Sequence, residues 1–210
     1  MSRMLRRKRE GRTVMMCPES SMAWIDRCIT DSLECIGTLR RQCARIAEAV
    51  GLLVGTLDAG NKVLTAGNGG SAAEAMHLAE ELVGRFRKNR RSLPGVALTA
   101  DGTALTCIGN DFGFDEVFSR QIEGLGAEGD LLVLFSTSGR AANLMRAVEA
   151  AREHRMSILL ILGRDGGPLA GKGDCELVVA CDQTERIQET HQVLLHILLE
   201  GVEQHFVVPS

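Results

Sequence analysis

The sequence predicts an α/β fold, a three-layer α-β-α sandwich in which helices cover both faces of a central parallel sheet, with a long helix added at the N-terminal side. Three observations support this prediction. Short runs rich in Val, Ile and Leu alternate with segments of helical periodicity from residue 62 onward. Residues 22–58 carry apolar side chains at three- and four-residue steps, as a long helix does. With 210 residues, 45% of them hydrophobic, the chain is long enough for one substantial core.

The first sixteen residues differ in composition from the rest, because they hold six basic residues and one acid. We expect residues 1–16 to be a basic, disordered extension and residues 17–210 to form a single domain. The extension lacks the apolar stretch of a secretory signal. It is either a tail that binds an anionic partner or, as we favour, a solvated extension without a role, unless Met15 or Met16 is the true start.

The remainder of the chain is acidic, with eighteen basic residues against twenty-six acids. Such a body does not attract nucleic acid by its long-range field, and aromatic side chains that stack on bases are scarce, at 3% with no Tyr. No apolar run approaches the roughly 20 residues of a membrane span. The seven cysteines form no Cys-x-x-Cys pair, which is typical of reduced thiols. We therefore expect a cytoplasmic protein with neither nucleic acid nor membrane as a partner.

The elements follow in order from these patterns. The long helix is expected from Met22 to about Asp58, where the turn residues after Asp58 end it. A helix of this length with apolar residues on more than one side often packs against another subunit. The expected strands are 62–66, 95–98, 130–135, 157–162 and 176–180, and the expected helices are 72–85, 102–109, 115–123, 141–154 and 184–207. Ligands bind past the carboxyl ends of the strands in such a sheet.

Two polar loops lie at those ends. One is Gly67-Asn68-Gly69-Gly70-Ser71 and the other is Ser136-Thr137-Ser138-Gly139, each between a strand and a helix. Glycines, hydroxyls and the free N–H groups of a helix start suit a phosphate group. Either loop by itself is also explained as a tight turn with a capping residue, Ser71 in the first case. Because two such loops follow strands of one sheet, we favour a ligand site. Neither is a dinucleotide fingerprint or a Walker loop.

Titratable side chains lie on two of the expected helices. His77 and Glu81 are four residues apart and therefore share one helix face, which suits general acid–base chemistry, metal ligation or a simple surface pair. Gln188 and His196 are eight residues apart on the last helix, about 12 Å of rise. They reach one point only by leaning toward each other or by coming from different subunits. His191, between them, is otherwise explained as a core histidine with a hydrogen-bond partner.

Together these segments resemble the phosphoheptose (sedoheptulose-7-phosphate) isomerase family, which has the sugar-isomerase (SIS) fold, a flavodoxin-like domain. The resemblance runs from about residue 22 to residue 206. The motifs that carry it are Gly67-Asn68-Gly69-Gly70-Ser71, Met76-His77-Leu78-Ala79-Glu80-Glu81-Leu82, Gly109-Asn110-Asp111-Phe112-Gly113-Phe114, Phe118-Ser119-Arg120, Ser136-Thr137-Ser138-Gly139, and Arg186-Ile187-Gln188-Glu189-Thr190-His191 with His196.

The resemblance implies a homotetramer with active sites at subunit interfaces. It also implies isomerisation of sedoheptulose 7-phosphate to D-glycero-D-manno-heptose 7-phosphate through an enediol, the first step toward nucleotide-activated heptoses. Carried over by position, Glu81 and His196 are the catalytic base and acid. One zinc ion per subunit is implied, with His77, Glu81, Gln188 and His196 as its ligands. The implied substrate contacts are Asn68, Gly69, Gly70, Ser71, His77, Glu81, Asn110, Asp111, Ser136, Thr137, Ser138 and Gln188.

Two adjacent positions depart from the family pattern. The family usually has Asn-Ser after Ser-Thr-Ser-Gly, whereas this chain has Arg140 and Ala141. A hydroxyl is lost and a cation gained, and this change bears on substrate preference. Two alternatives remain open from the sequence: a non-catalytic tetramer of the same fold that binds a replication initiator, and an isomerase or sugar-binding regulator for another phosphosugar. The presence of all four residues His77, Glu81, Gln188 and His196 favours the isomerase.

Overall fold

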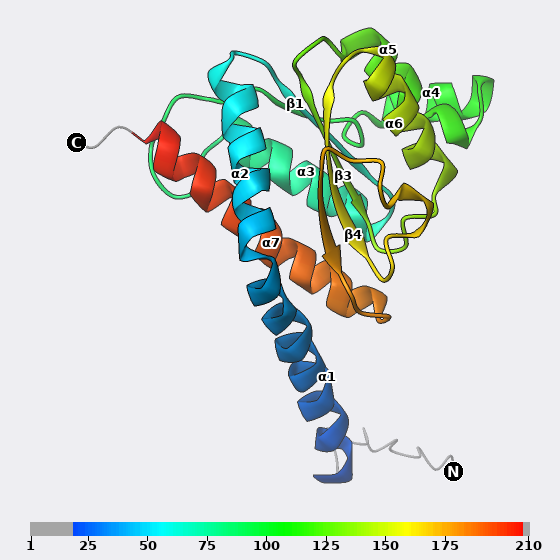
Figure 1. Ribbon diagram of the computed structural model, residues 1–210. Coiled ribbons are helices and arrows are strands. Elements are labelled where there is room, and N and C mark those ends of the chain that lie inside the picture. Colours follow the sequence, from blue (N-terminus) through cyan, green and yellow to red (C-terminus); the bar gives the residue numbers. More distant parts are fainter. Residues whose placement is uncertain (1–18, 208–210) are drawn as a thin grey trace, which may run out of the picture.

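Five parallel strands form the centre of the computed structural model, which describes residues 19–207 (Figure 1). Their order across the sheet is β2-β1-β3-β4-β5. This is the flavodoxin-like order, and the predicted fold class is confirmed. The strands are β1 (Val63–Gly67), β2 (Gly95–Ala97), β3 (Leu131–Ser136), β4 (Ser157–Gly163) and β5 (Cys175–Val179). All residues of β1 and β3 are buried, as expected for strands covered on both faces.

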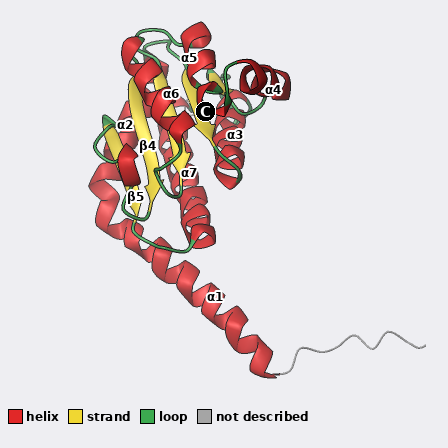
Figure 2. Ribbon diagram, turned by 90° about the vertical axis from the view of Figure 1, so that its right-hand side faces the viewer, coloured by secondary structure: helices red, strands yellow, loops and turns green. Residues whose placement is uncertain are grey.

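Helices cover both faces of the sheet (Figures 1 and 2). On one face α2 (Cys43–Asp58), α3 (Gly70–Val83) and α7 (Thr184–Phe206) enclose the larger hydrophobic cluster, to which each contributes Leu or Ile side chains. On the other face, α5 (Ser119–Leu125) and α6 (Ala142–Glu153) enclose the second cluster. The ten-residue helix α4 (Gly102–Asp111) has no buried residue and lies at the edge of this layer.

The long N-terminal helix is interrupted, contrary to the expectation of one helix over 22–58. The structure has α1 (Glu19–Gly37), a 3₁₀ segment (Thr38–Gln42) and then α2. The Gln42 side chain explains the break, because its amide donates to the carbonyl of Val178 on β5 (2.9 Å) and accepts from the N–H of Val178 (3.2 Å). This contact with an edge strand depends on tertiary packing, and the sequence pattern does not contain it. Beyond the break, α1 extends away from the body of the molecule (Figures 1 and 2).

Other boundaries differ by one or two residues. The region expected as one helix over 115–123 is a 3₁₀ turn (Phe114–Glu116) followed by α5. The six cysteines among the described residues are free thiols, and burial raises the pKa of Cys35 and Cys175. No helix in residues 19–207 has the length and apolar character required to cross a membrane. The basic extension expected over residues 1–16 lies outside the described part of the chain.

Candidate active site

The two polar loops lie next to each other at the point where the strand order reverses. β1 and β3 are neighbours, with Gly67 paired to Phe135 at their carboxyl ends. The chain leaves β1 into α3 on one face and leaves β3 into α6 on the opposite face. The two loops therefore flank the point at which the strand order reverses, which is where doubly wound sheets bind their ligands. This topology agrees with the position predicted for the ligand site, which stays a prediction.

The Gly67–Ser71 loop leaves the start of α3 uncapped. Gly69, not Ser71, occupies the N-cap position, with φ 58° and no side-chain cap, and Ser71 is buried in the first turn. The alternative explanation of this loop, a turn capped by Ser71, is therefore wrong. Within the described residues, the N–H groups of Gly69 and Gly70 have no protein acceptor. Free amides at a helix N-terminus carry partial positive charge and suit an anionic group.

The Ser136–Gly139 loop is held by its own hydroxyls. Ser136 Oγ accepts the N–H of Gly139 (2.9 Å), and Ser138 Oγ accepts the N–H of Arg140 (3.4 Å). Gly139 has φ 61° and lies so close to a neighbouring turn that a Cβ there would be 1.8 Å from the carbonyl oxygen of Gly166. The loop therefore requires glycine at this position, and its conformation is fixed by backbone packing.

A reciprocal pair of amides joins the two loops. Asn68 Nδ2 donates to Asn143 Oδ1 and Asn143 Nδ2 donates to Asn68 Oδ1, both at 2.9 Å. Asn143 is 2% exposed at the start of α6, and sequence reasoning did not single it out. A polar residue among the apolar positions of that helix was the available signal. Because both polar groups of Asn68 are used in this pair, its predicted substrate contact would have to share them.

The predicted acid–base residues come together where α3, which carries His77 and Glu81, packs against α7, which carries His196. His77 Nε2 lies 3.5 Å from Glu81 Oε1, and the ring centroids of His77 and His196 are 5.3 Å apart at an interplanar angle of 82°. All three side chains are partly exposed. Glu80 also contributes, with an oxygen 4.0 Å from His77 Nε2, so that His77, Glu80 and Glu81 form a cluster of possible metal donors. Glu80 was not among the predicted ligands.

A hydrogen bond fixes the tautomer of His77. Its Nδ1–H donates to Gln192 Oε1 at 3.0 Å, which leaves the Nε2 lone pair directed toward the carboxylates of Glu80 and Glu81. Lone pairs at this separation repel each other unless a proton or a cation lies between them. Two ligands of a tetrahedral zinc ion are about 3.3 Å apart, from metal–ligand distances of about 2.0–2.1 Å. The 3.5 Å separation of His77 Nε2 and Glu81 Oε1 fits such a pair.

Gln192 was missed by the sequence analysis, although its spacing marks it. Gln188, Gln192 and His196 follow each other at four-residue steps and form one polar stripe on α7. Gln188 lies at the other end of this stripe from His196, where a Cβ on Gly70 would be 2.1 Å from its amide nitrogen. The structure therefore places Gln188 at the start of α3, two helical turns before His77, and not in the His77–Glu81–His196 group.

A buried pair lies beneath this surface. His191 is 0% exposed and Glu74 is 2% exposed, with Nδ1 of the ring 3.4 Å from Glu74 Oε2. The other ring nitrogen, Nε2, is 3.2 Å from the carbonyl oxygen of Leu162 at the end of β4. Both ring nitrogens therefore face oxygen atoms, one of a carboxylate and one of the backbone. The interpretation of His191 as a core histidine with partners is confirmed, and the pair ties together α3, β4 and α7.

Comparison with known proteins identifies the family. Residues 29–163 match the SIS domain family. The chain is 45% identical over 177 residues to the phosphoheptose isomerase of Campylobacter concisus, covering 84% of this chain and 90% of that protein. It is 47% identical over 163 residues to that of Escherichia coli O139:H28, covering 77% and 84%. The chain belongs to the phosphoheptose isomerase family. The solved structure of phosphoheptose isomerase GmhA from Neisseria gonorrhoeae superposes with a TM-score of 0.82 at 38% identity, covering 88% and 99% of the two chains.

Two of the predicted substrate contacts lie apart from the other predicted site residues of this chain. Asn110 and Asp111 lie exposed at the end of α4, where Asn110 Nδ2 donates to Asp111 Oδ1 (2.7 Å). Within residues 19–207 no hydrogen bond or ion pair links either of them to the loops or to the His77 group. Arg140, which departs from the family pattern, is exposed and lies 3.3 Å from Asp165 Oδ2. Its charge is thus partly balanced by an acid of this chain.

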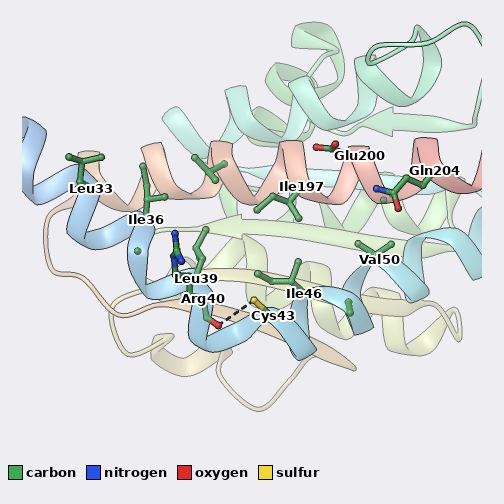
Figure 3. Close-up of a pocket in the computed structure, with 14 residues that line it drawn as sticks. Leu33, Ile36, Leu39, Arg40, Cys43, Ile46, Val50, Ile197, Glu200 and Gln204 are labelled. Atoms are coloured by element: carbon green, nitrogen blue, oxygen red, sulfur yellow. Dashed lines mark hydrogen bonds between the residues drawn. The ribbon is translucent and has the colours of Figure 1, made fainter.

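An apolar groove of this protein lies away from the predicted site residues. It has a volume of about 760 Å³ and runs between α7 and the α1–α2 segment (Figure 3). Leu33, Ile36, Ile46, Val50 and Ile197 line it. The groove contains none of the predicted site residues, and it has the composition of a surface that packs against protein.

We expect Gly139→Ala to destabilise the fold. The change adds a side chain at positive φ and against the Gly166 carbonyl, so the loss should exceed the roughly 1–3 kcal/mol of backbone strain alone. Gly171→Ala is the matched control, because Gly171 has φ 80° but open space around its Cβ position. Thermal unfolding of both variants measures the difference. Equal stability of the two would contradict the packing argument.

Proposed function

We propose that this protein is an aldose–ketose isomerase that converts sedoheptulose 7-phosphate to D-glycero-D-manno-heptose 7-phosphate, the first step of nucleotide-activated heptose biosynthesis. The observation that carries the proposal is the grouping of His77, Glu81 and His196 at family-matched positions on α3 and α7, about two helical turns along α3 from the first of two anion-suited loops. The names of the 45–47% identical relatives support the same reaction.

The reaction moves one proton between adjacent carbons. Glu81, as a carboxylate, removes a proton from C1 of the ketose, and the electron pair of that bond forms the C1–C2 double bond of an enediol. His196 donates a proton to O2 as the carbonyl opens. In the second half His196, having given up its proton, accepts the proton of the O1 hydroxyl as the C1 carbonyl forms, and Glu81 returns its proton to C2, which gives the aldose. A base near carbon and an acid near oxygen are the minimum for this chemistry.

The loops would hold the phosphate. The amides of Gly69 and Gly70 and the hydroxyls of Ser136, Thr137 and Ser138 are donors at neighbouring strand ends, and no basic side chain is needed for them to bind an anion. Arg140 lies next to this loop, and we propose that it adjusts substrate preference and leaves the reaction class unchanged.

Ser138→Ala is expected to raise KM for the substrate about tenfold with little change in kcat. The side-chain hydroxyl is one donor to the phosphate, and a hydrogen bond to a charged group contributes about 1.5–3 kcal/mol. Steady-state kinetics separates the two constants. An unchanged KM would show that groups other than the Ser138 hydroxyl bind the phosphate.

The donors around His77 fit zinc. His77, Glu81 and His196 would hold it, with a nitrogen lone pair and a carboxylate already at a ligand–ligand distance. Gln188, the fourth expected ligand, joins them only by leaning along α7 or from another subunit. Bound zinc would polarise the substrate's carbonyl and hydroxyl oxygens. Elemental analysis of the purified protein and of His77→Ala tests this site, and a metal content unaffected by the change would argue against it.

We propose a homotetramer located in the cytoplasm. The exposed apolar residues of α1, among them Trp24, Ile29 and Leu33, together with the groove beside α7, form a surface that a second copy would cover. The free thiols suit a reducing compartment. Light scattering of the protein in solution measures the assembly, and a monomeric mass would contradict it.

Proton NMR in heavy water tests the reaction itself. Purified protein with bound zinc and sedoheptulose 7-phosphate should give the anomeric signal of an aldoheptose 7-phosphate carrying deuterium at C2. If the protein neither converts this substrate nor exchanges its proton with solvent, the proposal is overturned. Other ketose phosphates would then be tried first, because of Arg140 and Ala141, before a binding protein without activity is considered.

A further inference from the structure

The ring of His196 is oriented by other rings. Within the described residues it makes no hydrogen bond. The His196 ring makes a T-shaped contact with the ring of His77. It is also stacked against the ring of Phe86, with centroids 5.6 Å apart and an interplanar angle of 26°. Phe86 belongs to the segment of residues 84–93 that follows α3, which we call the 84–93 loop. A residue outside the predicted site thus contacts the proposed acid.

The start of the 84–93 loop is fastened to α7. Glu203 Oε1 accepts the backbone N–H groups of Arg87 (2.7 Å) and Lys88 (3.0 Å), and Glu203 is only 6% exposed. A buried carboxylate with two amide donors makes strong, charge-assisted hydrogen bonds. Glu203 lies seven residues after His196, about two turns along the same helix. The helix that carries His196 therefore also fixes the backbone next to Phe86.

The end of the 84–93 loop is fastened to α3. The guanidinium of Arg90 donates to the carbonyl oxygens of Leu82 (2.9 Å) and Glu81 (2.6 Å), and the N–H of Leu93 donates to Leu82 (3.0 Å). A cation at the last carbonyls of a helix is favourable. Burial lowers the pKa of Arg90, which is partly buried. The loop thus connects the last turn of the helix that carries His77 and Glu81 with the helix that carries His196.

We propose that Phe86 is a positioning residue for His196 and that Glu203 holds Phe86 in place. This inference rests on the proposed function, because it assigns Phe86 to the orientation of the acid in that reaction. Phe86 stacks on the imidazole and limits its rotation, while the two fastened ends of the loop keep α3 and α7 in register. Small displacements of a reacting group lower the rate of the chemical step steeply. Substrate binding at the two loops does not depend on the orientation of His196.

The expected effect is on kcat, with KM nearly unchanged. Phe86→Leu should lower kcat about tenfold, because a branched aliphatic side chain fills space but does not stack. Phe86→Tyr keeps the ring and should restore most of the rate. Glu203→Gln keeps an acceptor oxygen without its charge and should give an intermediate loss. Glu200→Gln is the matched control, since Glu200 is exposed and forms an ion pair with the exposed side chain of Arg87 in the same loop (3.0 Å).

A spectroscopic measurement separates this inference from the proposed function. The chain has five histidines, and ring-labelled histidine with His196→Asn for assignment gives the His196 resonance. Loss of the Phe86 ring should shift that resonance by several tenths of a ppm, whether or not the protein isomerises the substrate. An inactive parent protein would overturn the reaction, whereas the shift still decides the contact.

Two results would overturn the inference. One is a Phe86→Leu variant with the parental kcat and an unshifted His196 resonance. The other is an equal effect of Glu200→Gln and Glu203→Gln, which would assign the loss to the loop's surface charge. Should Phe86→Leu fail to fold, Glu203→Gln gives the same decision through kcat and the His196 resonance, because it leaves the hydrophobic clusters unchanged.

Discussion

Glu81→Gln is expected to lower kcat by at least about 10³-fold while the fold and the assembly remain intact. An amide cannot accept the proton from C1, and a positioned general base contributes roughly 10²–10⁴-fold. His196→Asn should have an effect of the same order, because the enediol oxygen then lacks its proton donor. Conversion of the ketose and solvent deuterium uptake are the two measurements, with circular dichroism and light scattering as checks on structure.

Glu80→Gln is the matched control for the first variant. Glu80 is the neighbouring carboxylate, 66% exposed, and its oxygen is 4.0 Å from His77 Nε2 compared with 3.5 Å for Glu81. We expect it to retain much of the parental rate. Substantial turnover by Glu81→Gln or His196→Asn would remove that residue from the mechanism, and a larger loss in Glu80→Gln than in Glu81→Gln would transfer the role of base to Glu80.

Glu74→Leu is expected to destabilise the protein by about 3–5 kcal/mol, since it leaves His191 buried without its carboxylate partner. For a chain of this size that corresponds to a fall in Tm of roughly 10 °C. The double variant Glu74→Leu with His191→Leu should recover part of the loss, because replacing both members of a buried pair by apolar residues is often close to neutral.

Denaturant and thermal unfolding of the two single variants and the double variant measure this coupling. The cycle isolates the interaction from the separate cost of each substitution. Among residues 19–207, the second oxygen of Glu74, Oε1, is buried and has no hydrogen-bond partner, so the pair is not fully satisfied. Purely additive effects, or a single variant within about 1 kcal/mol of the parent, would show that the pair contributes little beyond packing.

The alternation of apolar runs and helical periodicity was sufficient to predict the sheet, the two helical layers and the two loops at strand ends. These features depend on local patterns. The break in the N-terminal helix could not be predicted, because Gln42 is tied to Val178, which is 136 residues away. The same reason applies to Asn143, whose role depends on the loop of a neighbouring strand.

The site was predictable as far as residue type and spacing reach. His77 and Glu81 share a face by their four-residue spacing, and the structure brings them together. The contributions of Gln192 and Phe86 depend on how α3, α7 and the 84–93 loop meet, and a single sequence does not specify such packing. Gln188 is the case that spacing leaves open, because about 12 Å of helix separates it from His196 within one chain, and its role as a ligand stays a prediction.

The contact of Gln42 with β5 also bears on solubility during folding. β5 is the last strand of the sheet, and an open strand edge is a template for pairing with another chain. Gln42 uses the N–H and the carbonyl of Val178 in the manner of a strand neighbour, so an extended segment from an unfolded copy cannot continue its ladder through this residue. The turn that interrupts the N-terminal helix therefore shields the sheet against edge-to-edge aggregation.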